Sequence, residues 1–153
     1  MCEKKSLYAV AAMRISIGVL TLWAFFDKLL GLGFATQNGK AWVDGVSPTY
    51  YYLAKVAHGP LQGLWQSIAG NVFVDYVYMF GLLAIGLSLI LGIFIRTGAL
   101  AGIVMFALFY LTDFPPQFNP ILDEHTVYIF SLVTVLACCN QKVLSVSNLF
   151  KKK

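Results

Sequence analysis

The residues best suited to chemistry are an imidazole, an amine and two carboxylates that the sequence places near apolar stretches. Asp123, Glu124 and His125 are consecutive, and imidazole and carboxylate side chains exchange protons near neutral pH. Tyr128 follows His125 by about one helical turn and adds a hydroxyl on the same side. Lys28 lies near the end of an apolar stretch, where an amine attracts anions. We therefore predict that Lys28, Asp123, Glu124 and His125 are catalytic and that Tyr128 binds the substrate beside them.

A further charge lies inside the first apolar stretch, residues 7–30. A charged side chain in the middle of a spanning helix costs about 2.5–3.5 kcal/mol, so Arg14 requires a partner or a route to water. Lys28 follows Arg14 by close to four turns, which points the two side chains within about 40° of each other. We predict that both face the protein interior, where Arg14 binds substrate with Lys28 and His125. The alternative is that each extends to a headgroup layer.

The chain offers few ligands for a tightly bound cofactor. Its histidines are His58 and His125, and the helix-breaking turn at His58 disfavours paired ligation of haem. Successive helical residues point in different directions, which disfavours a metal site at Asp123 to His125. We predict no haem, flavin or metal, and we keep a quinone, held by aromatic side chains, as the candidate cofactor. Cys138 and Cys139 are interpreted as small apolar residues, with a redox pair as the alternative.

The composition favours lipid rather than water around most of the chain. Of the 153 residues, 59% are hydrophobic and 12% are charged, whereas soluble domains carry about 25% charged residues. The net charge of +4 comes from basic residues at the ends of apolar runs, a pattern that sets membrane orientation and does not indicate nucleic-acid binding. We predict a single integral membrane domain over residues 1–153, with membrane lipid as a partner.

The apolar runs predict an all-α protein, a bundle of four transmembrane helices. The first loop, residues 31–72, is too polar to span, and its Tyr- and Trp-rich stripes predict two short amphipathic helices at the membrane interface. Asn119 and Pro120 suit the N-cap and the first position of the last helix. The spans are expected at about 7–30, 73–95, 97–112 and 120–140, and the short helices at about 48–57 and 61–69.

Basic residues predict a multi-pass protein of the cell membrane with both termini in the cytoplasm. With this orientation the cytoplasmic side holds Lys4, Lys5, Arg96, Lys142 and Lys151 to Lys153. The extracytoplasmic side then holds only Lys28, Lys40 and Lys55. Both histidines and most carboxylates also fall on the extracytoplasmic side, so the chemistry is expected there. The alternative is that these charges form a salt-bridge collar that only fixes the helices.

Two groups of residues resemble the DoxX/DoxD-like membrane proteins. The first is Arg14 with Gly18 and the run Asp27-Lys28-Leu29. The second and more specific is the run Asn119-Pro120-Ile121-Leu122-Asp123-Glu124-His125. The resemblance covers most of the chain, including a Trp42/Gly45/Pro48 pattern in the first loop. Phe26 is a departure, because a glycine is commoner at this place in the family.

The resemblance implies a redox-linked membrane subunit. DoxD-like proteins belong to thiosulfate:quinone oxidoreductase, which passes electrons from thiosulfate to membrane quinone. Lys28 and His125 are then expected to hold a small sulfur oxyanion or the quinone headgroup, while Asp123 and Glu124 relay protons. The implied partners are further copies of the chain or a second redox subunit. Catalysis by this chain alone stays open, as do a non-catalytic scaffold and a transporter-like bundle that binds a small molecule or lipid.

Overall fold

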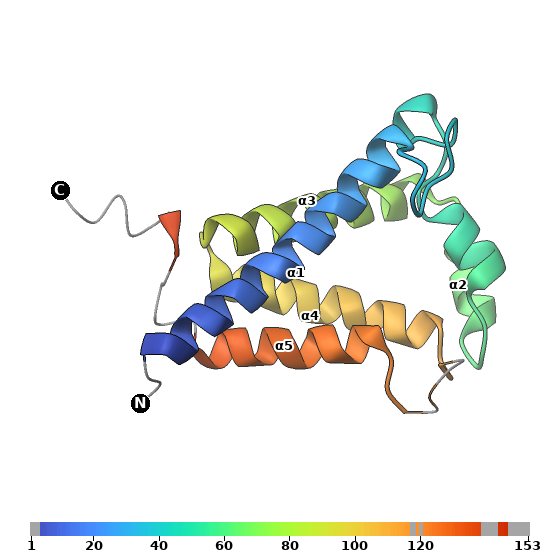
Figure 1. Ribbon diagram of the computed structural model, residues 1–153. Helices are drawn as coiled ribbons and strands as arrows, with labels where there is room; N and C mark the ends of the chain where they lie inside the picture. The colour runs from blue at the N-terminus through green and yellow to red at the C-terminus, as the bar shows by residue number, and fades with distance from the viewer. Residues whose placement is uncertain (1–3, 117–118, 120, 139–143, 147–153) are drawn as a thin grey trace.

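Four long helices lie side by side, with a short helix across one end (Figure 1). The computed structural model describes residues 4–116, 119, 121–138 and 144–146. We call the end of the bundle beside α2 the loop end, and the opposite end, which holds the α3–α4 connection, the turn end. The elements are α1 (Lys4–Leu30), the short turns η1 (Trp42–Asp44) and η2 (Tyr52–Val56), α2 (Gln62–Ile68), α3 (Val72–Leu91), α4 (Ile95–Thr112) and α5 (Glu124–Cys138).

Three of the helices are long and apolar enough to cross a bilayer: Ser6–Leu30, Val72–Leu91 and Ile95–Thr112. They coincide with the first three predicted spans, so the prediction of transmembrane helices is confirmed to this extent. α5 has 15 residues, which is about 23 Å of helix, whereas the hydrocarbon layer of a bilayer is about 30 Å thick. A fourth span therefore stays a prediction.

Two predicted boundaries are wrong. α3 ends at Leu91 rather than near residue 95, because Gly92 takes a left-handed φ of 70° and its N–H donates to the Ser88 carbonyl, which closes the helix. α5 begins at Glu124 rather than at Pro120, which lies outside the described residues.

The cap of α5 is Asp123 and not Asn119. The side-chain oxygen of Asn119 accepts the backbone N–H groups of Ile121 and Leu122 at 2.9 and 3.1 Å, which makes a local turn before the helix. The Asp123 carboxylate accepts the N–H of Thr126, three residues later, as an N-cap does. Both residue types cap helices well, so the sequence alone did not distinguish them.

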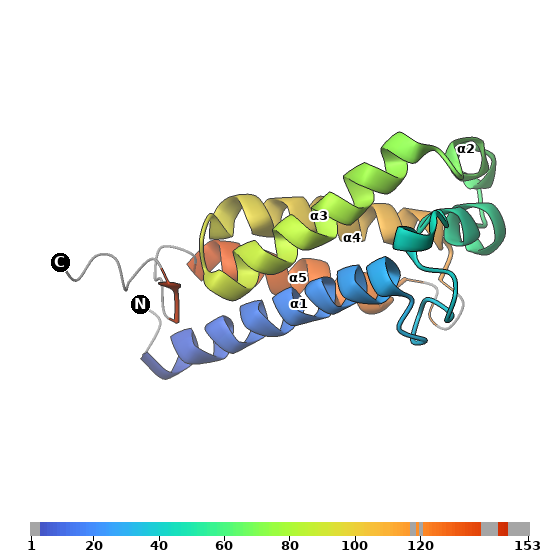
Figure 2. The same cartoon turned by 90° about the horizontal axis from the view of Figure 1, so that it is seen from above.

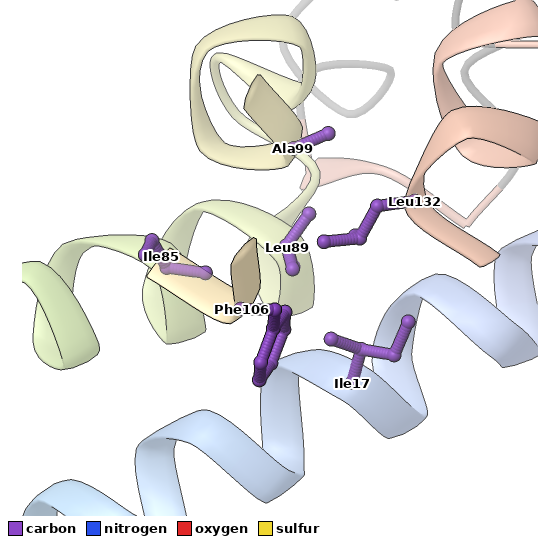
Figure 3. Packing of buried hydrophobic residues seen from close by; sticks show 6 residues of the cluster. All are labelled: Ile17, Ile85, Leu89, Ala99, Phe106 and Leu132. Carbon is purple, nitrogen blue, oxygen red and sulfur yellow. The ribbon is translucent and has the colours of Figure 1, made fainter. Parts of the chain in front are cut away.

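The core lies where the four long helices meet. Figure 3 shows its central cluster, which draws on all four: Ile17, Ile85, Leu89, Ala99, Phe106 and Leu132. α1 and α3 approach most closely through two glycines. A Cβ on Gly18 would lie 2.8 Å from Cγ1 of Ile90, and a Cβ on Gly86 would lie 2.9 Å from Cβ of Leu22. Small residues therefore let these two helices pack backbone to backbone, as in many membrane bundles.

The long first loop folds over the loop end of the bundle (Figure 2). Its segment from residue 47 to residue 70, here called the lid, contains η2 and α2 inside the two regions predicted to be short helices. The lid has a small core of its own in Leu53, Ala57 and Trp65. Buried Asp75 of α3 anchors it by accepting the hydroxyl hydrogens of Ser47 and Thr49. The location of the lid at a membrane interface stays a prediction.

Candidate functional site

A short hydrogen bond joins His125 to Asp123 at the loop end. Nδ1 of His125 lies 2.6 Å from Oδ2 of Asp123, and Oδ1 accepts the N–H and the hydroxyl of Thr126 at 2.9 and 2.8 Å. Burial raises the pKa of Asp123, but the hydrogen bonds from His125 and Thr126 outweigh burial and hold the pKa below its ordinary 3.8. An ionised carboxylate only accepts hydrogen bonds. Nδ1 of His125 therefore carries a proton, and Nε2 is the nitrogen left for a ligand.

Aromatic rings surround the imidazole of His125. Its ring centre lies 5.4 Å from that of Phe109, 6.3 Å from that of Phe106 and 6.5 Å from that of Tyr128. Nε2 makes no hydrogen bond to any residue in the described part of the chain. A single polar atom among flat apolar rings suits a flat ring-shaped ligand that carries a hydrogen-bonding group.

Lys28 joins this cluster from α1 through Tyr78 of α3. Its Nζ lies 6.0 Å from the centre of the Tyr78 ring, at the outer limit of a cation–π contact. The Tyr78 ring lies 5.9 Å from Phe109, which in turn contacts His125. Two aromatic rings, those of Tyr78 and Phe109, thus connect the predicted site residues Lys28 and His125 within one cluster.

Lys28 has no carboxylate within ion-pair distance among the described residues. The neighbouring Asp27 is buried, and its carboxylate accepts the backbone N–H groups of Phe34 and Thr36 at 3.2 and 2.8 Å. Asp27 therefore shapes the start of the first loop. Because Asp27 binds the loop backbone, the amine of Lys28 contributes its positive charge to the cluster.

The lid contributes Tyr52, whose ring lies 6.2 Å from that of Phe109. Burial, together with the negative charges of Asp113, Asp123 and Glu124, raises the pKa of Tyr52 to about 12. Its hydroxyl therefore stays protonated and neutral at any physiological pH. The cluster, here called the aromatic site, consists of Lys28, Tyr52, Tyr78, Phe106, Phe109, Asp123, His125 and Tyr128.

Glu124, the first residue of α5, has an exposed side chain and lies beside the aromatic site. Arg14 lies elsewhere. It faces the interior as predicted, with 3% of its surface exposed, but its Nη2 donates to the carbonyl of Leu144 at 2.8 Å. The fourteen residues between Arg14 and Lys28 correspond to about 21 Å along α1. The two share a face of the helix but not a depth, so the structure does not bring Arg14 to the aromatic site.

Four aromatic members of the site were missing from the sequence prediction: Tyr52, Tyr78, Phe106 and Phe109. Tyr78 lies one turn after Asp75 on α3, a local signal that could have placed it near the loop end. Phe109 lies one turn before Asp113 in the same way. Tyr52 reaches the site only because the lid folds back over the bundle. No local sequence pattern predicts this long-range contact.

Within the described ranges, no group of three or more His, Cys, Asp or Glu side chains is arranged to hold a metal ion. Cys138 is partly buried at the end of α5, and Cys139 lies outside the described residues. Compared with protein-family models, with characterised proteins and with solved structures, the chain matches none of them.

Proposed function

We propose that the chain is a DoxX/DoxD-like protein that crosses the membrane four times, with both termini in the cytoplasm. In this proposal α5 is the fourth span. It packs along α4 and also touches α1, so it lies among the three longer helices. Its exposed side chains include Val127, Phe130 and Val133, which suits a surface in contact with lipid. The loop end then faces the extracytoplasmic side, as the distribution of basic residues favours.

For the aromatic site, we propose that it binds the headgroup of a membrane quinone in a redox complex. The observation that carries this proposal is the His125 ring, held by Asp123 through Nδ1 and surrounded by Phe106, Phe109 and Tyr128. A quinone headgroup is a flat ring with two carbonyl oxygens. It needs aromatic surface for the ring and a hydrogen-bond donor at each oxygen. In the imidazolium form of His125 Nε2 also donates, so Nε2 and the amine of Lys28 fit these two positions chemically.

The residues of the site are suited to proton transfer. A bound quinone would accept two electrons and two protons. Protonated His125 donates from Nε2, while Asp123 orients the ring and stabilises the imidazolium ion. Glu124 is exposed at the start of α5 and exchanges protons with the solution. The ring of Tyr78 lies beside the amine of Lys28, and the ring of Tyr52 packs against Phe109.

The electron donor in this proposal is a small sulfur oxyanion such as thiosulfate. An amine without a carboxylate partner in the described structure attracts an anion, which is the part that Lys28 contributes. The choice of thiosulfate, and of a second redox subunit or further copies of the chain as partners, rests on the family resemblance.

A non-catalytic scaffold is the second candidate, and one observation favours it. Asp27, Asp75 and Asp113 all lie near the loop end, and each carboxylate contacts the first loop. These carboxylates hold the first loop against the ends of the helices, as expected of a collar with a purely structural role. A transporter-like bundle is favoured by Tyr52 alone, because this residue brings the lid into contact with the aromatic site.

Quinone reduction in reconstituted membranes tests the redox proposal. The protein, purified with its co-purifying partners, is placed in nanodiscs with a ubiquinone or menaquinone analogue and thiosulfate, and quinol formation is followed by absorbance. At limiting thiosulfate, Lys28→Ala and His125→Ala should strongly lower quinol formation while the protein still assembles in the membrane. Lys40→Ala, an exposed lysine of the first loop, should not. No reduction in any combination would refute the redox proposal, and loss of assembly in the two variants would favour the scaffold.

A further inference from the structure

The lid is fastened to the end of α4 by the segment that contains His58. The backbone N–H of His58 donates to the carbonyl of Thr112 at 3.2 Å. The next residue, Gly59, has a left-handed φ of 77°, and a Cβ there would collide with the carbonyl oxygen of Phe114. The lid and the segment after α4 therefore meet backbone to backbone, and any side chain at position 59 would separate them.

Both ring nitrogens of His58 face oxygen atoms. Nδ1 lies 3.2 Å from the carbonyl of Val56 and 3.3 Å from Oδ1 of Asp113, and Nε2 lies 3.1 Å from the carbonyl of Pro115. A carbonyl oxygen never donates a hydrogen bond, and an ionised carboxylate does not either. A neutral imidazole carries one N–H and can satisfy only one side, so this arrangement fits the imidazolium form, in which both nitrogens donate.

We propose that His58 is a proton-controlled latch that holds the lid on α4 while its ring is protonated and thereby keeps Tyr52 over the aromatic site. The latch joins two regions far apart in the chain, since Pro115 follows His58 by 57 positions. When the latch opens, η2 still contacts α4 through one pair of rings among the described residues, Tyr52 and Phe109. His58 touches no member of the aromatic site, so it is a positioning residue and not a catalytic one.

The direction of the pH response follows from the partners of the ring. The carbonyls of Pro115 and Val56 raise the pKa of His58 above its ordinary 6.5; burial opposes this weakly, and the charge of Asp113 adds to the increase. A group whose pKa is raised in the docked state stabilises that state fully below pH 6.5, and this contribution is lost as the pH rises through the raised value.

The ring of His58 is open enough to exchange protons with the solvent. Its side chain keeps 31% of its surface exposed and that of Asp113 keeps 28%, so protons reach both without unfolding. Asp113 is the charged group that faces the ring among the described residues. Lys55, on the same segment, points to solvent as an exposed side chain.

Nuclear magnetic resonance of the protein labelled with [15N]histidine tests the latch directly. The chain has two histidines, so the spectra contain two pairs of ring nitrogens, which the variant His58→Gln assigns. The ring shifts report when His58 loses its proton. The exchange rate of its backbone N–H, corrected for the intrinsic effect of pH, reports how often the contact with Thr112 opens. The latch predicts that protection falls about tenfold between pH 5.5 and pH 8.5, the effect of losing one charge-assisted hydrogen bond.

The variants are compared with the native protein by hydrogen exchange, measured by mass spectrometry on peptides that cover residues 52–59. His58→Gln has no charge to lose and should show the same corrected protection at both pH values. Asp44→Asn removes an exposed carboxylate of the same loop and should respond like the native chain. The proposal is overturned if the His58 ring loses its proton in this range while the protection of the native protein stays constant, or if the ring is already neutral at pH 5.5. Neither measurement involves a quinone, so this result and that of the redox assay are independent.

Discussion

Asp123 holds the ring of His125 through one carboxylate oxygen, at 2.6 Å from Nδ1, while its other oxygen caps α5 by accepting from Thr126. One side chain thus determines both where the helix begins and how the imidazole is turned. The helix start and the candidate site are therefore coupled, and a change at residue 123 is expected to affect stability and function to different degrees depending on the substitution.

Asp123→Ala should lower the free energy of unfolding by about 1 kcal/mol, because it removes the N-cap. Asp123→Asn should stay within about 0.5 kcal/mol of the native protein, because asparagine caps equally well. The asparagine variant should still reduce quinone about tenfold more slowly, because a neutral amide stabilises an imidazolium ion less than a carboxylate does. Unfolding in mixed detergent micelles and the quinol assay separate the two effects. Equal activity of the native protein and Asp123→Asn would show that the charge has no role.

The sequence predicted the long helices well because each signal was local. The apolar lengths of α1, α3 and α4 and the inward face of Arg14 follow from residues within a few turns of each other. The contacts of the lid could not be predicted in this way, since Tyr52 meets Phe109 and His58 meets Asp113 across more than fifty positions. The depth of Arg14 was also missed, because helical periodicity gives the direction of a side chain but not its partner, here the carbonyl of Leu144.

Gly92→Ala should destabilise the turn end by about 1–3 kcal/mol. Residue 92 has a φ of 70°, and a Cβ there would lie 2.5 Å from Nη1 of Arg14 and 2.7 Å from Cβ of Ser145. The variant therefore forces apart the buried arginine and the segment that it holds. Gly63→Ala is the matched control, because apart from the adjacent backbone of its own helix nothing lies within 4 Å of the added Cβ. Unfolding in detergent should rank the two variants clearly, and equal stability would contradict the close packing at residue 92.

Lys28→Met keeps the length and the apolar stem of the side chain and removes the charge. If the amine attracts the oxyanion, the thiosulfate concentration for half-maximal quinone reduction should rise about tenfold, the effect of one charge-assisted contact. Lys40→Met, at an exposed position of the first loop, should leave that concentration unchanged. A fall in the maximal rate with no change in half-saturation would show that Lys28 acts on the quinone alone and does not bind the oxyanion.

Tyr52 should ionise late when the protein is titrated with base, because its pKa in the folded protein is about 12 against an ordinary 10.0. The neutral phenol is the form that the folded state favours, so its contribution to stability is complete below pH 10 and is lost as the pH rises through about 12. The tyrosinate absorbance of the native protein minus that of Tyr52→Phe should show this late transition. Tyr51→Phe, which removes the hydroxyl from an exposed ring, should leave it in place. A difference spectrum with its midpoint near pH 10 would show that Tyr52 is not enclosed by the lid and the carboxylates.

The number of spans decides on which side of the membrane the C-terminus lies. If α5 crosses the bilayer, a fluorescent protein fused after Lys153 is cytoplasmic. In a variant whose native cysteines Cys2, Cys138 and Cys139 are replaced, Gly63→Cys on α2 then reacts with an impermeant maleimide added outside intact cells. With its 15 described residues α5 is shorter than a typical span, but it packs against α4 and α1. A helix shorter than the hydrocarbon layer still crosses where the bilayer thins around it or where flanking side chains extend to the headgroups. A C-terminal tag found outside the cell while the Gly63→Cys variant still reacts would mean three spans. The same tag result with an unreactive Gly63→Cys would mean an inverted bundle, which places Arg14 and the turn end where the positive charges do not predict them.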